Sequence, residues 1–368
     1  MKIDSYNIAP DLMKTTTNYQ KLKKHIVALA TLPETEAPVI SAYFAAGKPR
    51  SAQAAELESW ASVVRHSFRG RQGRDFEEAL EEIVDHLETV STSQGLAVFS
   101  RWGDYPMFLP LQFGVPLETF FQAGRLPAIY PLVELKDRFN RFVLVVTNSE
   151  AARIYEINLG EVSESLLAER PGLRERLGRE WTREHYQNHR RHRDQQFLKE
   201  KVAIIEQIMA KRGHNALVLA GEPRFVSRLR NSLPKHLQSR IAGEIRAGVR
   251  KNALPAVISE SIQSFLEQED RESHDAVRRL DNAVQRGGLA VVGLAQTMDA
   301  LQAGQADLLV LAQDLPESDR EKLVRQAVQT ETRIETVRGS RLLEKNGGAG
   351  CLLRYLGPPV GSRVATVA

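Results

Sequence analysis

The stretch RFVLVVTNSEAARIYEI, residues 141–157, contains two runs of β-branched, aliphatic and aromatic residues, Phe142–Thr147 and Ala152–Ile157. Such residues favour strands. The three polar residues between the runs, Asn148, Ser149 and Glu150, supply a turn. The stretch therefore predicts a β-hairpin, and the rest of the fold can be worked outward from it.

The segment after the hairpin predicts a layered α/β unit. Apolar residues return at helical spacing before Gly213, which is suited to cap a long helix. The run ALVLAG, Ala216–Gly221, follows as a strand, and EPRFVSRLRNSL predicts a helix with Pro223 in its first turn. The periodic residues of the long helix are Phe197, Leu198, Val202, Ile205, Ile208 and Met209. Strand, long helix, strand and helix in this order are typical of an α/β domain.

On the N-terminal side we expect an amphipathic helix from Tyr19 and a strand at Val39–Phe44. Two core-facing helices are predicted within Ser51–Phe68 and Asp75–Val90 from their apolar spacing. Between Gly95 and Leu135, the runs GLAVFSRW, MFLPLQF and PAIYPLVEL are interrupted by Gly and Pro and predict short strands. These elements make an α+β first domain that ends near Asp137.

On the C-terminal side a long helix, Ala256 to about Leu280, is expected to link the second domain to a third. The next elements form a βαβ unit: a strand at Leu289–Val292, a helix at Thr297–Ala303 and a strand at Leu308–Leu311. The run beginning RIETV predicts another strand, and the terminal CLLRYL an edge element. The predicted fold class is α/β, with an α+β N-terminal domain (1–137) followed by two α/β domains (138–254 and 255–368).

Composition narrows the class of protein. The chain has 368 residues, 42% of them hydrophobic, which excludes a disordered or fibrous protein. Its one cysteine, Cys351, cannot form an internal disulfide and lies in an apolar run, so we expect a buried core thiol. The N-terminus lacks the apolar core of a signal peptide, and no apolar run is long enough to span a membrane. We therefore expect a cytoplasmic protein without a membrane partner.

Positive charge is concentrated in one short segment. The formal net charge of the chain is +4, but Arg170 to Arg193 holds eight arginines against three glutamates, a local charge of +5, so the remainder sums to −1. Arginine suits phosphate contacts, and interleaved aromatic rings can stack on unpaired bases. The residues expected to contact RNA are Arg174, Arg176, Arg179, Trp181, Arg183, His185, His189, Arg190, Arg191 and Arg193. The alternative is a solvated helix face with arginine–glutamate pairs.

Catalytic and cofactor motifs are few. His185, His189 and His192 would share one face of a helix, but HYQNH lacks the glutamate of a zinc hydrolase, and the neighbouring arginines disfavour a dication. The chain has no G-x-S-x-G elbow, and GGLAVVG at residues 287–293 has no lysine and does not make a phosphate loop. We expect no metal and no small-molecule cofactor, and no catalytic residue can be assigned.

The order of these parts resembles the archaeo-eukaryotic class 1 release factors and Pelota, and more closely the bacterial archaeo-eukaryotic release factor (baeRF) family. The resemblance spans nearly the whole chain. It is carried by SEAARIYEI at 149–157, ALVLAG at 216–221, GLAQTMDALQAGQADLLVL at 293–311 and GGAGCLLRY at 347–355. It implies a three-domain factor that enters the ribosome, contacts rRNA and tRNA, and uses its third domain for protein partners such as a translation GTPase.

The chain departs from the release factors at one point. Their Gly-Gly-Gln tripeptide positions a water for peptidyl-ester hydrolysis, whereas this chain reads RERLGREWTREHYQ in that region and has no Gly-Gly-Gln. We therefore expect a non-catalytic or weakly catalytic factor in rescue of stalled ribosomes, hibernation or translational quality control. Two alternatives stay open. One is a peptidyl-tRNA hydrolase or RNA-cleaving enzyme with His185 or His189 as general base, and the other is a non-ribosomal polyanion-binding protein.

Overall fold

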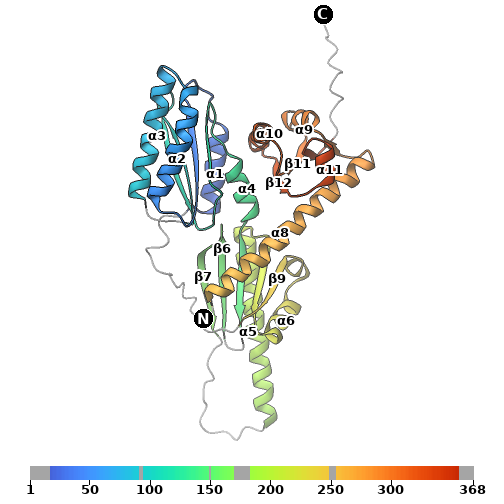
Figure 1. Ribbon diagram of the computed structural model, residues 1–368. Coiled ribbons are helices and arrows are strands. Elements are labelled where there is room, and N and C mark those ends of the chain that lie inside the picture. Colours follow the sequence, from blue (N-terminus) through green and yellow to red (C-terminus); the bar gives the residue numbers. More distant parts are fainter. Residues whose placement is uncertain (1–16, 91–93, 149–150, 170–182, 248–253, 356–368) are drawn as a thin grey trace, which may run out of the picture. The chain divides into compact units, whose positions relative to one another are not determined.

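The computed structural model describes residues 17–90, 94–148, 151–169, 183–247 and 254–355 (Figure 1). It separates them into two compact units. We call Phe139–Gln268 the central unit. The composite unit combines Thr16–Arg138 with the chain from Glu269 onward. The division into 1–137, 138–254 and 255–368 stays a prediction.

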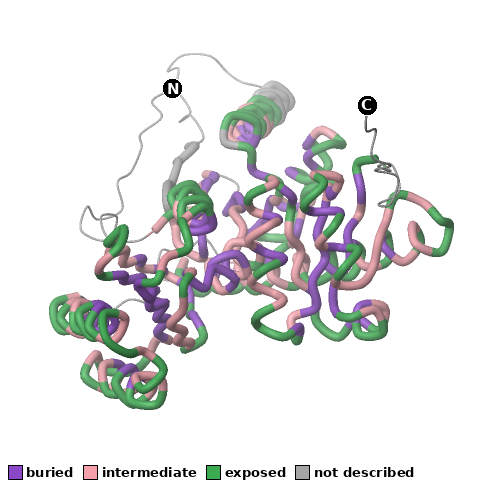
Figure 2. The backbone as a smooth tube through the Cα atoms, turned by 90° about the horizontal axis from the view of Figure 1, so that it is seen from above, coloured by how far each residue is buried: buried purple, intermediate pink, exposed green. Residues whose placement is uncertain are grey.

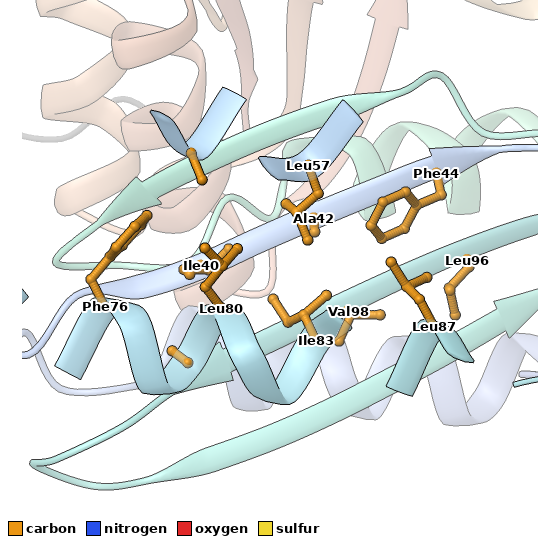
Figure 3. Packing of buried hydrophobic residues seen from close by; sticks show 12 residues of the cluster. Ile40, Ala42, Phe44, Leu57, Phe76, Leu80, Ile83, Leu87, Leu96 and Val98 are labelled. Carbon is orange, nitrogen blue, oxygen red and sulfur yellow. The ribbon is translucent and has the colours of Figure 1, made fainter. Parts of the chain in front are cut away.

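The first part of the composite unit contains a four-stranded antiparallel sheet in the order β3-β2-β1-β4. Helices α2 and α3 pack on one face of it (Figure 3), where Phe76, Leu80 and Ile83 of α3 meet Ile40 and Val98 of the strands. The elements are α1 (Tyr19–Ala30), β1 (Val39–Ala45), α2 (Arg50–Val64), η1 (Arg65–Ser67), α3 (Arg71–Thr89), β2 (Gly95–Arg101), β3 (Met107–Phe113), β4 (Phe120–Gly124) and α4 (Tyr130–Arg138).

The sequence prediction for this part is confirmed except at one element. The run PAIYPLVEL, expected as a strand, contains helix α4 instead. Pro131 takes one of the first helical positions, where its missing N–H costs nothing, and apolar side chains follow on the buried side at helical spacing. These are Leu132, Val133 and Leu135.

The central unit is built on a mixed five-stranded sheet in the order β7-β6-β5-β8-β9. The predicted hairpin is β5 with β6, and ALVLAG is β8, which runs parallel to β5. The sequence analysis assigned no strand to residues 161–169, which form β7. The elements are β5 (Phe142–Thr147), β6 (Ala151–Asn158), β7 (Glu161–Glu169), α5 (Arg183–Arg212), β8 (Ala216–Gly221), α6 (Pro223–Ser232), α7 (Lys235–Gln238), β9 (Ile241–Arg246) and the start of α8 (Leu254–Gln285).

Both faces of this sheet are covered. Phe142 and Leu144 of β5 contribute to the core that contains Phe265 of α8, whereas Val143 and Val145 contribute to the core with Ile205 of α5. This accounts for the unbroken apolar run in β5. Gly213 has φ +64° after the last turn of α5, and the N–H of the next residue donates to the carbonyl of Met209 at 3.1 Å, as in a Schellman cap.

The last part of the composite unit holds a second four-stranded sheet, in the order β10-β13-β11-β12. Ala276 and Leu280 of α8 pack against it together with Leu308 and Val310 of β11. The elements are β10 (Ala290–Val292), α9 (Leu294–Gln302), β11 (Ala306–Ala312), α10 (Glu317–Gln329), β12 (Arg333–Val337), α11 (Arg341–Lys345) and β13 (Ala349–Leu353). Figure 2 shows the strands largely buried and the outward helix surfaces exposed.

The predicted strand–helix–strand order is present as β10, α9 and β11, but one expectation for this sheet is wrong. The strands of the predicted βαβ unit, β10 and β11, are not neighbours, because β13 lies between them and is antiparallel to both. The terminal CLLRYL is therefore not an edge element. Its Cys351 is fully buried, which an edge strand facing water would not achieve. No helix in the described residues is long and apolar enough to cross a membrane.

Candidate nucleic-acid interface

The predicted RNA contacts fall into two groups in the structure. Arg174, Arg176, Arg179 and Trp181 lie outside the described residues. Arg183, His185, His189, Arg190, Arg191 and Arg193 lie in the first turns of helix α5. The sequence analysis assigned no helix to this second group, which is helical in the structure. From Arg183 to Arg212 the chain contains neither Gly nor Pro and is rich in Arg, Lys, Gln and Glu, which are good helix formers.

Helical spacing places these residues around α5. Arg183, Arg190 and Phe197 follow one another at intervals of seven residues and so share one side of the helix. Phe197, Ile205 and Met209 are buried in the central unit, whereas the first turns of α5 run past the end of its sheet (Figure 1). The side of α5 that is apolar over the sheet thus becomes arginine-rich beyond it. His185 and His189 lie about half a turn away.

A second surface with aromatic and basic residues lies in the composite unit. The connection between β2 and β3 carries Trp102 and Tyr105, which are 46% and 66% exposed. Large aromatic rings are normally buried, so two exposed rings three residues apart mark a contact surface. We call residues 102–105 the aromatic loop.

The aromatic loop is held in one conformation by its neighbours. Tyr105 has φ +52°, a region that residues other than glycine seldom adopt and that recurs at functional sites. The buried Arg101 donates from Nε to the carbonyl oxygen of Tyr105 at 2.9 Å, and its Cζ lies 6.0 Å from the centre of the Tyr105 ring. Asp104 pairs with Arg71 at 3.0 Å. These contacts therefore hold the backbone that carries the two exposed rings in one conformation.

Arginines surround the start of α3, on which this loop rests. The first turn of α3 contains no acidic residue, although the helix dipole favours one there. Arg69 and Arg74 are exposed, and no described residue pairs with either of them. The positive helix end and the free guanidinium groups together suit an anion.

The sequence analysis named Trp181 among the expected RNA contacts and did not include Trp102. The missed signal is the polar turn GDYP, which projects two aromatic residues between apolar strands, together with the arginines of RGRQGR at 69–74. These two stretches are thirty residues apart, so only the folded chain shows that they meet. The contact is direct, since Gly103 lies against Asp75 and a Cβ added there would be 2.7 Å from Asp75 Oδ2.

Cys351 has no reactive environment. It is fully buried in β13, and burial raises the pKa of its thiol to about 12. Among the described residues no group of three or more His, Cys, Asp and Glu side chains is arranged to hold a metal ion.

The sequence matches the model of one protein family. Residues 127–265 match the model of bacterial archaeo-eukaryotic release factor family 10. This segment includes α4 and nearly all of the central unit. No curated protein matches the sequence.

Several solved structures are similar to the chain. A model of ribosome-bound archaeal Pelota and ABCE1 has 14% identity and a TM-score of 0.45, covering 96% of this chain and 99% of that one. Dom34 of S. cerevisiae, a translation termination-like factor that interacts with Hbs1, has 11% identity and a TM-score of 0.43, covering 70% and 75%. The archaeal translation termination factor aRF1 has 17% identity and a TM-score of 0.30, covering 93% and 100%.

The hairpin and ALVLAG, on which the resemblance was based, lie inside the matched segment. The resemblance to the bacterial archaeo-eukaryotic release factor family is thereby confirmed, through the match of residues 127–265 to the model of family 10.

Proposed function

We propose that this protein is a ribosome-associated translation factor that acts in rescue of stalled ribosomes, hibernation or translational quality control. It binds unpaired rRNA or tRNA through the aromatic loop and through the arginine-rich segment Arg174–Arg193. The proposal is supported by the match of residues 127–265 to a release-factor-like family model and by the chemistry of these two surfaces.

The aromatic loop is the observation that carries the proposal. Two exposed rings, Trp102 and Tyr105, lie in a loop that contacts the start of α3, where Arg69 and Arg74 have no acidic partner among the described residues. Rings stack on bases without regard to sequence, and each base–ring stack contributes about 1–3 kcal/mol. Guanidinium groups nearby contact the phosphates that link the bases. A surface for a membrane or an apolar protein would not need free arginines around its rings.

The arginine-rich segment supplies the second contact. The arginines of α5 lie in the first turns of the helix, which run past the end of the sheet. A helix of basic character there can track a phosphate backbone.

Partner binding is assigned to the part of the composite unit after Glu269. Its sheet strands contain no aromatic residue, so base stacking is not its chemistry. A protein partner, such as a translation GTPase, fits better than RNA, and we propose this part as its docking surface.

The test is co-sedimentation with purified ribosomes through a sucrose cushion, before and after a wash with about 0.5 M salt. The wild-type protein should pellet with ribosomes at low salt. The double variant Trp102→Ala/Tyr105→Ala should bind at least tenfold more weakly, because two stacks of about 1–3 kcal/mol each are lost. Tyr355→Ala, which removes another exposed ring, is the matched control and should bind as the wild type does.

The result decides between the candidate functions. Ribosome binding that is equal in the double variant and in the control would rule out the aromatic loop as an RNA contact. Absence of ribosome binding by the wild-type protein, with retained binding to heparin, would favour the non-ribosomal polyanion-binding alternative.

A further inference from the structure

A recess in the composite unit is lined by an excess of carboxyl groups. Five of them border it: Glu134, Asp137, Glu269, Asp270 and Glu335. They come from three elements, α4, α8 and β12, that are distant in the sequence. The cations that border the recess are Arg138 and Arg338, with His274 as a third if it is protonated.

The recess lies next to the two places where the chain leaves and re-enters the composite unit. The chain leaves after Arg138, at the end of α4, and re-enters at Glu269 within α8. Asp137 and Glu269 thus stand beside the two covalent connections to Phe139–Gln268. Packing of α4 and α8 against β12 decides how firmly both connections are held.

Hydrogen bonds tie these elements together through the carboxyl groups. The backbone N–H and the hydroxyl of Thr336 on β12 both donate to Asp137 Oδ2 at 3.0 Å. The Ser273 hydroxyl on α8 lies within hydrogen-bond distance of Glu335 Oε1 and of the carbonyl oxygen of Glu269. One hydroxyl proton cannot serve two acceptors. If the Glu335 carboxyl holds a proton, it can donate to Ser273 while Ser273 donates to the carbonyl.

The pKa values of these groups point in the same direction. Burial, and next the charge of Glu335, raise the pKa of Asp137 to about 7, although the Thr336 hydrogen bonds oppose this. Burial, followed by the charges of Glu272, Asp137, Glu335 and Asp270, raises the pKa of Glu269 to about 8. Burial also raises the pKa of Glu335 against the effect of its hydrogen bond to Ser273.

We propose that Asp137, Glu269 and Glu335 form a proton-operated latch: with protons bound they hold α4, α8 and β12 together, and their ionisation loosens α8 beyond Glu269 from β12. Because this part of α8 and the end of α4 carry both connections to Phe139–Gln268, the latch controls how rigidly those connections are anchored. The latch does not depend on the proposed RNA binding.

The charges around the latch do not neutralise it. The groups that act on the three carboxyls are, from α4, Glu134, Lys136 and Arg138; from α8, Asp270, Glu272, His274 and Arg279; and from β12 and the turn after it, Arg333 and Arg338. Arg333 also pairs with Asp307 at 2.6 Å. Opposite charges therefore moderate the repulsion among the carboxyls, while protons remove it.

The sign of the pH dependence follows from these shifts. A carboxyl whose pKa is higher in the closed form than in the open form keeps its proton longer when closed. The closed form is therefore favoured at low pH and loses its advantage as the pH rises from about 4 to about 7–8. For each proton that the closed form retains, its population relative to the open form falls about tenfold per pH unit in that window.

The experiment is amide hydrogen exchange on the full-length protein at pH 5.5, 6.5, 7.5 and 8.5, with rates corrected for the intrinsic pH dependence of exchange. Peptides covering 269–276 and 333–338 report on the latch. Wild-type protection there should fall at least tenfold between pH 5.5 and 7.5 and level off above pH 8. Peptides from α3, remote in sequence and outside the latch, should show no such fall.

The variant Glu269→Gln isolates the charge. The carboxylate of Glu269 makes no hydrogen bond with the described residues. Replacing it with an amide should therefore disturb the structure little. The variant should raise protection from exchange at pH 8.5. It should also uncouple about one proton from opening, so that protection falls about tenfold less per pH unit than in the wild type. The control is Asp270→Asn, an exposed neighbour that borders the same recess, which should keep most of the wild-type slope.

A second variant, Glu335→Gln, tests whether the effect of Glu269→Gln comes from the loss of a carboxylate charge. In Glu335→Gln the amide can donate to Ser273 as the protonated carboxyl does, so protection at pH 8.5 should rise here too. An unchanged slope in Glu269→Gln, or protection at pH 8.5 lowered by Glu335→Gln, would overturn the proposal, because the ionised carboxylates would then be the form that holds the elements together.

Discussion

Arg325 on α10 donates from Nη1 to the carbonyl oxygen of Leu29, in the last turn of α1, at 3.0 Å, although the two residues are 296 positions apart. The same nitrogen reaches the carbonyl of Ala30 at 3.1 Å, and Gln329 donates to that oxygen at 2.9 Å. The last carbonyls of a helix have no partner within it, so side chains of α10 complete the end of α1. These hydrogen bonds therefore join α1 and α10, from the two ends of the sequence, within the composite unit.

Arg325→Ala should lower the free energy of unfolding of the composite unit by about 2–4 kcal/mol, because the carbonyls of Leu29, Ala30 and Pro127 all lose a charged donor. Urea denaturation followed by circular dichroism measures this. The matched control, Lys322→Ala on the exposed side of the same helix, should stay within about 0.5 kcal/mol of the wild type. Equal stability of the two variants would show that the contact contributes nothing.

Gly103→Ala should disturb the aromatic loop. Gly103 has φ +84°, which costs other residues about 1–2 kcal/mol, and its new Cβ would meet Asp75 Oδ2 at 2.7 Å. The control Gly47→Ala has a similar φ of +87° but open space around it, so it carries the backbone cost alone. Gly103→Ala should therefore be the less stable variant by denaturation and the only one of the two with weakened RNA binding. Equal effects would mean that the loop tolerates displacement from α3.

Cys351 should react with a thiol reagent only after unfolding. It is fully buried, and burial raises its pKa to about 12, so almost no thiolate exists at neutral pH. With Ellman's reagent at pH 8 the native protein should release no chromophore over minutes, and the urea-unfolded protein should release one equivalent. Rapid reaction of the native protein would contradict the position of β13 in the middle of its sheet.

The sequence predicted an element correctly where the residues of that element alone determine its structure. The alternation and turn of residues 141–157, the spacing in α3 and α5, and Pro223 at the start of α6 predicted those elements correctly. The errors concern features that depend on distant partners. Strand β13 reads as an edge element until β10 and β11 flank it, and α4 reads as a strand because its aromatic and proline residues resemble the strands before it.

The candidate site was only partly predictable for the same reason. The arginine excess of residues 170–193 is visible in the sequence, whereas the contact of the aromatic loop with the basic start of α3, through Asp75 and Arg71, appears only in the folded chain. The carboxyl latch combines residues of α4, α8 and β12, so no single stretch of the sequence predicts it. A chain cut after Leu254 would lose Val257 and Phe265 from the core of the central unit, so the experiments use full-length variants.

The missing Gly-Gly-Gln tripeptide predicts that the purified protein does not release nascent peptide from ribosome-bound peptidyl-tRNA at the rate of a class 1 release factor. A release factor assayed on the same complexes is the positive control. The amount of free peptide over time should match that of the uncatalysed reaction. Rapid release that is abolished by Glu180→Ala or His185→Ala would instead support the peptidyl-tRNA hydrolase alternative.

The central claim, that this protein binds RNA, is tested most directly by the salt dependence of binding, with the arginine-rich segment as the contact that is removed. Affinity for a single-stranded RNA oligonucleotide is measured from about 50 to 300 mM salt for the wild type and for Arg190→Ala/Arg191→Ala/Arg193→Ala. Each lost phosphate contact removes about 0.7 from the slope of log affinity against log salt, so the triple variant should bind more weakly with a slope shallower by about 2.

The matched control removes three other exposed arginines, Arg271, Arg278 and Arg286, and should keep the wild-type slope. A triple variant of α5 whose slope equals that of the wild type, in protein shown by circular dichroism to be folded, would contradict the assignment of Arg174–Arg193 as an RNA contact.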